Sequence, residues 1–328
     1  MKMPRSTNAL LLCAFLAFVS SAHGQPIAPD YPSRPMRLIV PLSPGGLVDT
    51  FARTVGQYFS ERFGQPVVVE NRPGASQAIA ADALARSAPD GYTLLLATQS
   101  GIISTTVVRK SLPYDVLRDF APISMLFESP LYLVVHPSVP ANSVAELIKL
   151  AKAQPGKLSF ATIGTGTAPH IACALFMKMT GVDLLHVPYK GSASAMADLL
   201  SGQVQLMFEG GVSSLPQART GKLRALATTA ARRTEAMPSL ATVSEAGVPG
   251  YELNTWFGLM TNAGVPRTII DRLNREAGAM LKLPATHEKF KAAGIELLPS
   301  TPEAFAERIR SELPKWTRIM RELGIQPE

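Results

Sequence analysis

Two hydrophobic patterns alternate along the chain: short continuous apolar runs, and longer segments in which apolar residues recur every three or four positions. Residues 38–40 form the first short run, of the kind that a parallel sheet buries on both faces. Phe51, Val55 and Phe59 then recur at helical spacing, and Pro-Gly-Gly at residues 44–46 separates the two segments. The pattern predicts a buried strand, a glycine turn and a helix.

The same alternation continues after this first unit. Residues 66–70 and 92–97 are further apolar runs, and an Ala-rich segment over 75–86 lies between them. The resulting order of strand, helix, strand, helix and strand is typical of a parallel sheet with helices on both faces. Two more strands are predicted at residues 120–127 and 131–136.

A second unit repeats this succession. A capping box at Ser143 predicts a helix that ends near Gln154. A strand over 157–162 then leads through a Gly-rich turn into a helix over 168–180. The remaining predicted elements are strands over 182–189, 204–208 and 222–229, a helix over 192–200, an extended aromatic segment over 251–260, and two C-terminal helices that begin at Pro266 and after Thr301, the second kinked at Pro314.

The N-terminal 24 residues have a different composition. Lys2 and Arg5 precede an apolar stretch and a small-residue exit, which predicts a secretory signal peptide cleaved after Ala22 or Gly24. The apolar stretch is too short to span a membrane. We therefore expect a periplasmic protein, and with Cys173 as the one cysteine left after cleavage it has no internal disulfide.

The remaining composition is that of a globular protein, 46% hydrophobic and 17% charged, and 328 residues are enough for two domains. Cleavage removes two of the 32 basic residues and none of the 25 acidic ones, so the formal net charge falls from +7 to +5. This charge is spread along the chain without a basic run or interleaved aromatic residues, which argues against a nucleic-acid partner.

Two glycine turns, at residues 43–46 and 164–167, each precede a predicted helix. The N–H groups of a helix's first turn lack intrahelical partners and favour an anion; a tight turn without a ligand is the alternative. Neither turn has a nucleotide-binding sequence. Because the turns fall in two units, a cleft between two domains would let one helix N-terminus from each side hold an anionic group.

The sequence offers little for catalysis. The histidines of the mature chain are scattered and lack metal-ligand spacing, so we expect neither a metal nor a cofactor. His170 and Cys173 are three residues apart, which suits the base and nucleophile of an acyl-transfer or hydrolytic enzyme. The alternative, which we favour, is that Cys173 is a small buried hydrophobe.

Further candidate residues for a ligand cleft lie at or near predicted strands. Lys190 either pairs with a carboxylate or is solvated. Glu209 would repel a carboxylate, so it is either turned away or bonded to a hydrogen-bond donor on the ligand. Trp256 and Phe257 are core residues or an apolar wall of the cleft, and the core is favoured.

Six ordered motifs resemble the Bug family of periplasmic solute receptors, the receptor component of tripartite tricarboxylate transport systems. They are residues 41–46 with Asp49, 69–74, 164–167 with His170, 187–191, 202–204 with Phe208, and 221–226. The resemblance implies a type II periplasmic-binding-protein fold, with two α/β domains that close on a small carboxylate and no enzymatic activity. Family members usually carry Asp where this chain has Glu209.

The resemblance also implies the domain limits and the binding site. The first domain would be discontinuous, residues 31–131 plus 254–328, and the second 132–253, with hinge strands near 131–136 and 251–257. The protein would be a monomer that passes its ligand to a membrane permease or a sensor kinase. The predicted ligand-binding residues are Leu42, Ser43, Pro44, Gly45, Gly46, Asp49, Ser100, Gly164, Thr165, Gly166, Thr167, His170, Tyr189, Lys190, Phe208 and Glu209.

Overall fold

The first strand, turn and helix form as the sequence predicts. Strand β1 (Met36–Val40) is followed by helix α1 (Leu47–Phe63), which ends at Gly64 in the left-handed conformation. Its apolar stripe of Phe51, Val55 and Phe59 is fully buried. The structure, a computed structural model, describes residues 31–325, so the predicted signal peptide lies outside the described residues.

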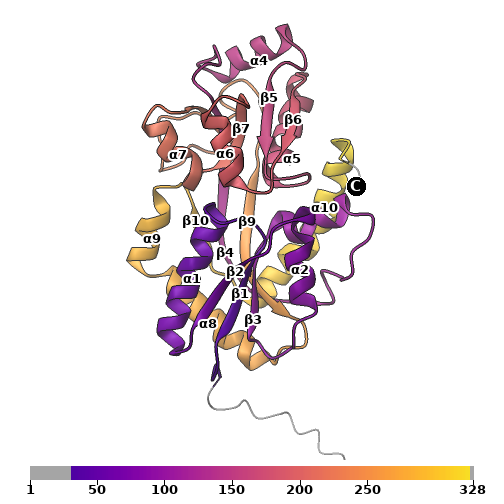
Figure 1. Ribbon diagram of the computed structural model, residues 1–328, viewed down its shortest axis with the longest axis vertical. Coiled ribbons are helices and arrows are strands. Elements are labelled where there is room, and N and C mark those ends of the chain that lie inside the picture. Colours follow the sequence, from indigo (N-terminus) through magenta and orange to yellow (C-terminus); the bar gives the residue numbers. More distant parts are fainter. Residues whose placement is uncertain (1–30, 326–328) are drawn as a thin grey trace, which may run out of the picture. The chain divides into compact units, whose positions relative to one another are not determined.

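The other elements follow in the order shown in Figure 1. The remaining strands are β2 (Val67–Asn71), β3 (Thr93–Thr98), β4 (Phe120–Val135), β5 (Ser159–Thr162), β6 (Leu185–Pro188), β7 (Leu206–Gly210), β8 (Arg224–Thr228), β9 (Asn254–Asn262) and β10 (Glu296–Leu297). The remaining helices are η1 (Ala75–Gln77), α2 (Ala78–Ala85), η2 (Ser100–Ser104), α3 (Thr105–Val108), α4 (Val144–Ala153), α5 (Ala168–Thr180), α6 (Ser192–Leu200), α7 (Gly211–Arg219), α8 (Arg267–Leu281), α9 (Pro284–Lys291) and α10 (Pro302–Glu322).

The strands are joined edge to edge in the order β2-β1-β3-β9-β4-β7-β5-β6, with β10 and β8 also paired to β4. Strand β1 is parallel to β2 and β3, and β5 is parallel to β6 and β7. The chain's return through β9 is antiparallel to both β3 and β4. The three strands of the first unit are therefore parallel, as predicted, whereas β9 and β4 make the sheet as a whole mixed.

Strand β4 connects the two halves of the sheet. The strands predicted separately at 120–127 and 131–136 form one strand of 16 residues. Its first part pairs with β9 as far as Pro130, and Leu131 onward pairs with β7 and β8. Pro122 stands beside a register shift, where a missing N–H is tolerated. Within the described part of the chain, residues 32–325 belong to one compact unit.

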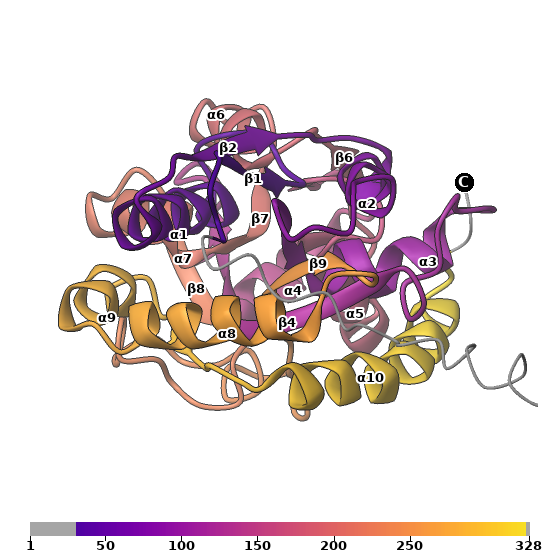
Figure 2. The same cartoon turned by 90° about the horizontal axis from the view of Figure 1, so that it is seen from below.

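Alternate residues of β4 serve two different cores, as the pleat of a strand requires. Leu131, Leu133 and Val135 belong to the cluster under α5, and Tyr132 and Val134 to the cluster under α6. Helices α8 and α10 also pack against β4, and Figure 2 shows them along one side of the sheet. Within residues 31–325 no helix is long and apolar enough to cross a membrane.

Three local predictions need correction. The segment predicted as one helix over 75–86 begins with η1, in a left-handed backbone, and only α2 is α-helical. The capping box at Ser143 is half formed: Ser143 Oγ accepts from Glu146 N–H, but the Glu146 carboxylate accepts from Asn142 N–H. The third correction is an omission, because the sequence analysis did not anticipate α7 and α9. Helix α10 continues past Pro314 to Glu322, as predicted.

Candidate functional site

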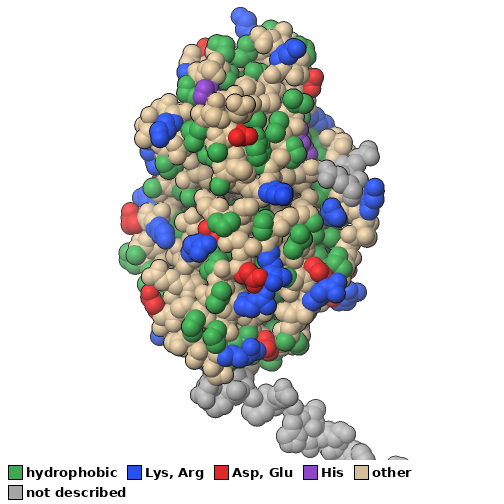
Figure 3. All heavy atoms as spheres, in the orientation of Figure 1, with side chains coloured by type: hydrophobic (Ala, Val, Ile, Leu, Met, Phe, Trp, Pro, Cys, Tyr) green, Lys and Arg blue, Asp and Glu red, His purple; other side chains and the backbone are tan. Residues whose placement is uncertain are grey.

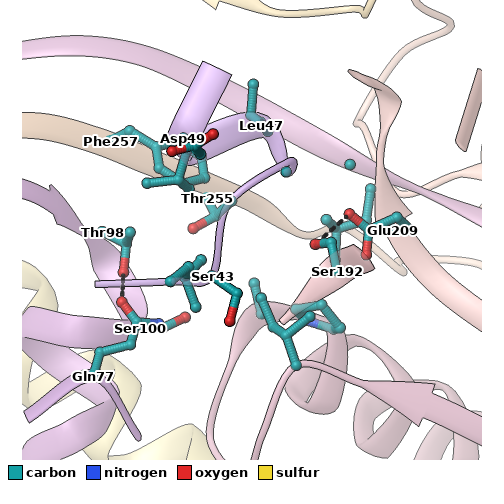
Figure 4. A pocket seen from close by; sticks show the side chains of 18 residues that line it. Ser43, Leu47, Asp49, Gln77, Thr98, Ser100, Ser192, Glu209, Thr255 and Phe257 are labelled. Carbon is teal, nitrogen blue, oxygen red and sulfur yellow. Dashed lines mark hydrogen bonds between the residues drawn. The ribbon is translucent and has the colours of Figure 1, made fainter. Parts of the chain in front are cut away.

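A pocket lies where the ends of both halves of the sheet meet (Figure 4). It encloses about 590 Å³, counting the part open to solvent, which is within the range of small-molecule sites. Its lining is Leu42, Ser43, Gly46, Leu47, Val48, Asp49, Gln77, Thr98, Ser100, Leu131, Ile163, Ala168, Pro169, Ser192, Glu209, Gly210, Thr255 and Phe257. The lining combines eight apolar side chains with eight polar ones and two glycines.

Four helices begin at this pocket. Leu47 and Val48 open α1, Ala168 opens α5, Ser192 opens α6, and Gly210 immediately precedes α7. None of these four N-termini is capped by the side chain of its own N-cap residue. Uncapped N-termini carry partial positive charge and free N–H groups, so their convergence favours an anion in the pocket.

The pocket obtains this positive potential without a cationic side chain, because no Lys, Arg or His is among its lining residues. On the face that Figure 3 shows, basic and acidic side chains are interspersed rather than gathered by sign. Attraction for an anion in the pocket would therefore have to come from backbone N–H groups, against the carboxyl groups of Asp49 and Glu209 that also line it.

Asp49 holds the first glycine turn in place rather than offering free acceptors. Its carboxylate accepts from Gly45 N–H at 3.1 Å, from Arg53 Nε and Nη2 at 3.0 Å, and from Asn71 Nδ2 at 3.0 Å. Burial favours the neutral acid, but the hydrogen bonds from Arg53, Gly45 and Asn71 outweigh it and keep the Asp49 pKa below its ordinary value. Asn71 Nδ2 also donates to Leu42 O at 2.9 Å, so β2 fixes both ends of the turn.

The first turn contacts the loop that precedes α6. Ser43 Oγ donates to Lys190 O at 3.3 Å, and a Cβ on Gly191 would lie 2.7 Å from Ser43 Cβ. A Cβ on Gly46 would lie 3.3 Å from Ser192 Oγ. Gly46 has φ −92°, which any residue adopts, so its role is to leave room. Gly45, with φ 93°, needs glycine for its backbone angle.

Glu209, at the end of β7, is a buried acid with one oxygen unused. Its Oε1 accepts from Ser192 Oγ at 3.1 Å, and Oε2 has no hydrogen-bond partner within residues 31–325. Burial raises the Glu209 pKa to about 7, against the opposing effect of donors on Ser192, Gly210 and Ser213. Near neutral pH this group is therefore either an acid that can donate or a carboxylate that seeks a donor.

Figure 4 places Ser192 and Glu209 on one side of the pocket and Gln77, Thr98 and Ser100 on the other. Thr98 Oγ1 donates to Gln77 Oε1 at 2.7 Å. Ser43 lies between these two polar groups (Figure 4), and the pocket suits a short molecule with a polar group at each end.

Six of the predicted ligand-binding residues line the pocket: Leu42, Ser43, Gly46, Asp49, Ser100 and Glu209. The structure places the others outside the lining: Pro44, Gly45, Gly164, Thr165, Gly166, Thr167, His170, Tyr189, Lys190 and Phe208.

The second glycine turn satisfies its own polar groups. Thr167 Oγ1 donates to Gly164 O at 2.6 Å, and Gly166 N–H donates to His170 Nδ1 at 3.0 Å. A Cβ on Gly166 would lie 2.6 Å from Val108, so this glycine serves a close packing contact. Burial, and secondarily the neighbouring His186, lowers the His170 pKa to about 4. The residues that flank this turn, rather than the turn itself, line the pocket.

The candidates at strand ends also face elsewhere. Tyr189 Oη donates to Asp198 at 2.6 Å, and burial followed by this bond raises the Tyr189 pKa to about 12. Lys190 is exposed, and only its backbone carbonyl contacts the site, where it accepts the hydrogen bond from Ser43 Oγ. Phe208 is buried beside Phe176 and Tyr251.

The two adjacent aromatic candidates have different roles. Trp256 is a buried core residue whose Nε1 donates to Glu312 at 2.7 Å. Phe257 is also buried, stacks on Phe127, and at the same time lines the pocket.

Cys173 is an inert core residue. It is fully buried, and burial raises the pKa of its thiol well above the ordinary value, so the thiolate that a nucleophile needs is disfavoured. His170 Nδ1 is occupied by the backbone of Gly166. Among residues 31–325, no group of three or more His, Cys, Asp and Glu side chains is placed to hold a metal ion.

The sequence analysis missed two kinds of lining residue. Leu47, Val48, Ala168, Pro169 and Ser192 open the helices that follow predicted ligand-binding residues, and counting two residues further would have found them. The others have no local signal: Gln77, Thr98, Leu131, Ile163, Gly210 and Thr255.

Comparison with known proteins agrees with this geometry. Residues 51–325 match the tripartite tricarboxylate transporter family receptor, TctC. Protein BugT of Bordetella pertussis is 38% identical over 96% of this chain and 97% of its own. The structure of R. palustris Rpa4515 with adipate has a TM-score of 0.88 at 35% identity, covering 91% of this chain and all of that one. MatC from Rhodopseudomonas palustris with bound malate has a TM-score of 0.83 at 28% identity, over 88% and 99% of the two chains.

These likenesses confirm the α/β periplasmic-binding-protein fold and the predicted family. The chain belongs to the TctC, or Bug, family of tripartite tricarboxylate transporter receptors, which are periplasmic solute-binding proteins and not enzymes.

Proposed function

We propose that this protein captures a small carboxylate in the pocket between the two halves of its sheet. The observation that carries the proposal is the convergence of four uncapped helix N-termini on a pocket whose lining holds no cationic side chain. The relatives with adipate and with malate support the same ligand class. The captured acid would pass to a membrane permease or a sensor.

Binding would close two domains around the ligand, residues 31–131 plus 254–328 and residues 132–253. Two features support this part of the proposal. Strand β4 continues from one half of the sheet into the other, which suits a hinge. The contact of Ser43 with Lys190 joins the two halves beside the pocket, so a ligand seated there favours the closed arrangement.

Glu209 narrows the ligand class. Its Oε2 accepts no hydrogen bond within residues 31–325, and an anion beside an ionised Glu209 would be repelled. We propose that the ligand brings a hydrogen-bond donor, such as an amino, amide or hydroxyl group, besides its carboxylate. Glu209→Gln should then change the ranking of ligands more than the affinity for all of them.

We also propose that the chain is exported to the periplasm and cleaved after Ala22 or Gly24. These residues lie outside the part of the chain that the structure describes. N-terminal sequencing of the protein released from the periplasm would identify the cleavage site, and an intact Met1 on that protein would contradict the proposal.

The binding proposal is tested by thermal unfolding in the presence of monocarboxylates, dicarboxylates, tricarboxylates, amino acids and aromatic acids. A ligand at a hundred times its Kd stabilises the folded protein by about 2.7 kcal/mol. We expect at least one carboxylate in the panel to do so, and its amide analogue not to. If no carboxylate stabilises the protein, the proposed function is wrong.

A further inference from the structure

Three consecutive residues other than glycine adopt the left-handed conformation immediately before α2. Ala75, Ser76 and Gln77 have φ of 47°, 52° and 77°. L-residues rarely adopt these angles, and an uninterrupted run of three is strained. Such strain persists where the surrounding structure fixes it, and it gathers at functional sites. The question is what this turn achieves.

The turn is held in place by hydrogen bonds on each side. Gln77 N–H donates to Gly74 O at 2.9 Å, and Thr105 Oγ1 donates to Ser76 O at 2.6 Å. The neighbouring backbone also makes room for it, because a Cβ on Gly101 would lie 2.7 Å from Gln77 Oε1. The result is that Gln77, unlike exposed Ala75, is buried and reaches the pocket wall.

The Gln77 amide is oriented by Thr98. The Thr98 hydroxyl accepts from Gly101 N–H at 2.9 Å and donates its proton to Gln77 Oε1 at 2.7 Å. Its oxygen is therefore engaged, whereas the amide nitrogen has no protein acceptor within residues 31–325. Nε2 is not among the enclosed polar atoms that lack a partner, so it is open to the pocket that Gln77 lines, where a ligand oxygen can accept from its N–H groups.

We propose that Gln77 is a specificity-determining residue, which donates from Nε2 to an oxygen acceptor at the end of the ligand remote from Glu209. This inference rests on the proposed function and extends it. The main carboxylate would lie at the helix N-termini, and Gln77, beside Ser100, would bind a second oxygen-bearing group (Figure 4). The preferred class is then a short dicarboxylate, or a carboxylate with an equivalent acceptor at its far end.

Two pairs of acids of equal chain length test this subsite: adipate against hexanoate, and succinate against butyrate. Each pair differs only in the second carboxylate. We expect the wild type to bind the dicarboxylate of at least one pair more tightly, as measured by titration calorimetry on the full mature chain. Gln77→Gly keeps the left-handed backbone without strain and removes the amide.

In Gln77→Gly, the ratio of the dicarboxylate affinity to the monocarboxylate affinity should fall about ten-fold or more, because one hydrogen bond to a charged group is lost. Gln77→Glu keeps the shape but adds a negative charge, so it should weaken the dicarboxylate further and affect the monocarboxylate less. Ser76→Gly is the matched control, because it changes the same strained turn at a side chain outside the pocket lining. It should leave the ratio unchanged.

The outcomes separate this inference from the proposed function. If a carboxylate binds but Gln77→Gly leaves the ratio unchanged, or lowers it no more than Ser76→Gly does, Gln77 does not determine specificity while the receptor function stands. If wild type binds hexanoate and butyrate as tightly as adipate and succinate, the second subsite is also contradicted. If no acid in either pair or in the wider panel binds, both proposals fail.

Discussion

Replacing Glu209 with glutamine should remove a pH dependence from the stability of the empty protein. Glu209 is buried, its Oε2 has no partner within residues 31–325, and burial raises its pKa from 4.5 to about 7. Between these two pH values the folded protein keeps a proton that the unfolded chain has lost. The unfolded state therefore binds fewer protons, and the free energy of unfolding falls as pH rises.

The size of the effect follows from the pKa difference. A shift of this size corresponds to about 3 kcal/mol of stability, present below about pH 4.5 and lost by the time the pH has risen through about 7. Because the Glu209 side chain is almost entirely enclosed, solvent screening reduces this contribution to stability only slightly. Glutamine has the same shape, can still accept from Ser192 Oγ, and carries no titratable proton.

Urea unfolding of both proteins between pH 5 and pH 8 measures this difference without ligand. We expect the stability of Glu209→Gln, relative to wild type, to rise by about 2 kcal/mol over this interval. Every other titrating group is common to both proteins and cancels. The same substitution at exposed Glu252 is the matched control. The reasoning is refuted if the free energies of unfolding of the two proteins change in parallel from pH 5 to pH 8. It is also refuted if wild type becomes more stable relative to the variant as pH rises.

Three further predictions concern the turn and its partners. Gly191→Ala places a Cβ 2.7 Å from Ser43 Cβ, so it should weaken carboxylate binding about ten-fold in calorimetry; equal affinity would show that the contact is not needed for binding. Asp49→Asn removes the charge that pairs with Arg53 and should cost about 1–3 kcal/mol in urea unfolding, and a variant as stable as wild type would contradict the role of Asp49 in holding the turn. A bound carboxylate should reduce the radius of gyration in solution scattering, and an unchanged radius at saturation would argue against hinge closure.

The fold was predictable where the determinants are local. The helix over 168–180 has the limits expected from a turn before it and Gly181 after it, and α6 begins at Ser192 as its sequence indicates. Strand β4 was predicted as two strands, over 120–127 and 131–136, with Pro122 inside the first and Pro130 in the gap between them. Both prolines are tolerated, one beside a register shift and the other where pairing passes from β9 to β7. That change of partner depends on the whole sheet, and no local pattern reports it.

The site was predictable in part for the same reason. Glu209 was a candidate because it ends a predicted strand, where residues of a cleft are expected, and the structure places it in the pocket lining. The turn at Gly166 was predicted to bind the ligand because it resembles the first turn, but the Gly166 N–H already donates to His170 Nδ1. Gln77 and Thr255 lie far apart in the chain and meet only through the order of strands. Their place in the pocket is a tertiary property.

The central claim is that a carboxylate is held by backbone groups rather than by a cationic side chain. Titration calorimetry of the tightest-binding acid tests it most directly, on wild type, Lys190→Ala and Gly46→Val, at about 10 mM and about 150 mM salt. Short bonds in a sheltered pocket are little screened, so the wild-type Kd should change only slightly with salt. Gly46→Val should abolish binding, because its side chain crowds Ser192, and Lys190→Ala should weaken binding less. Normal binding by Gly46→Val, with binding lost in Lys190→Ala or at the higher salt, would contradict the claim.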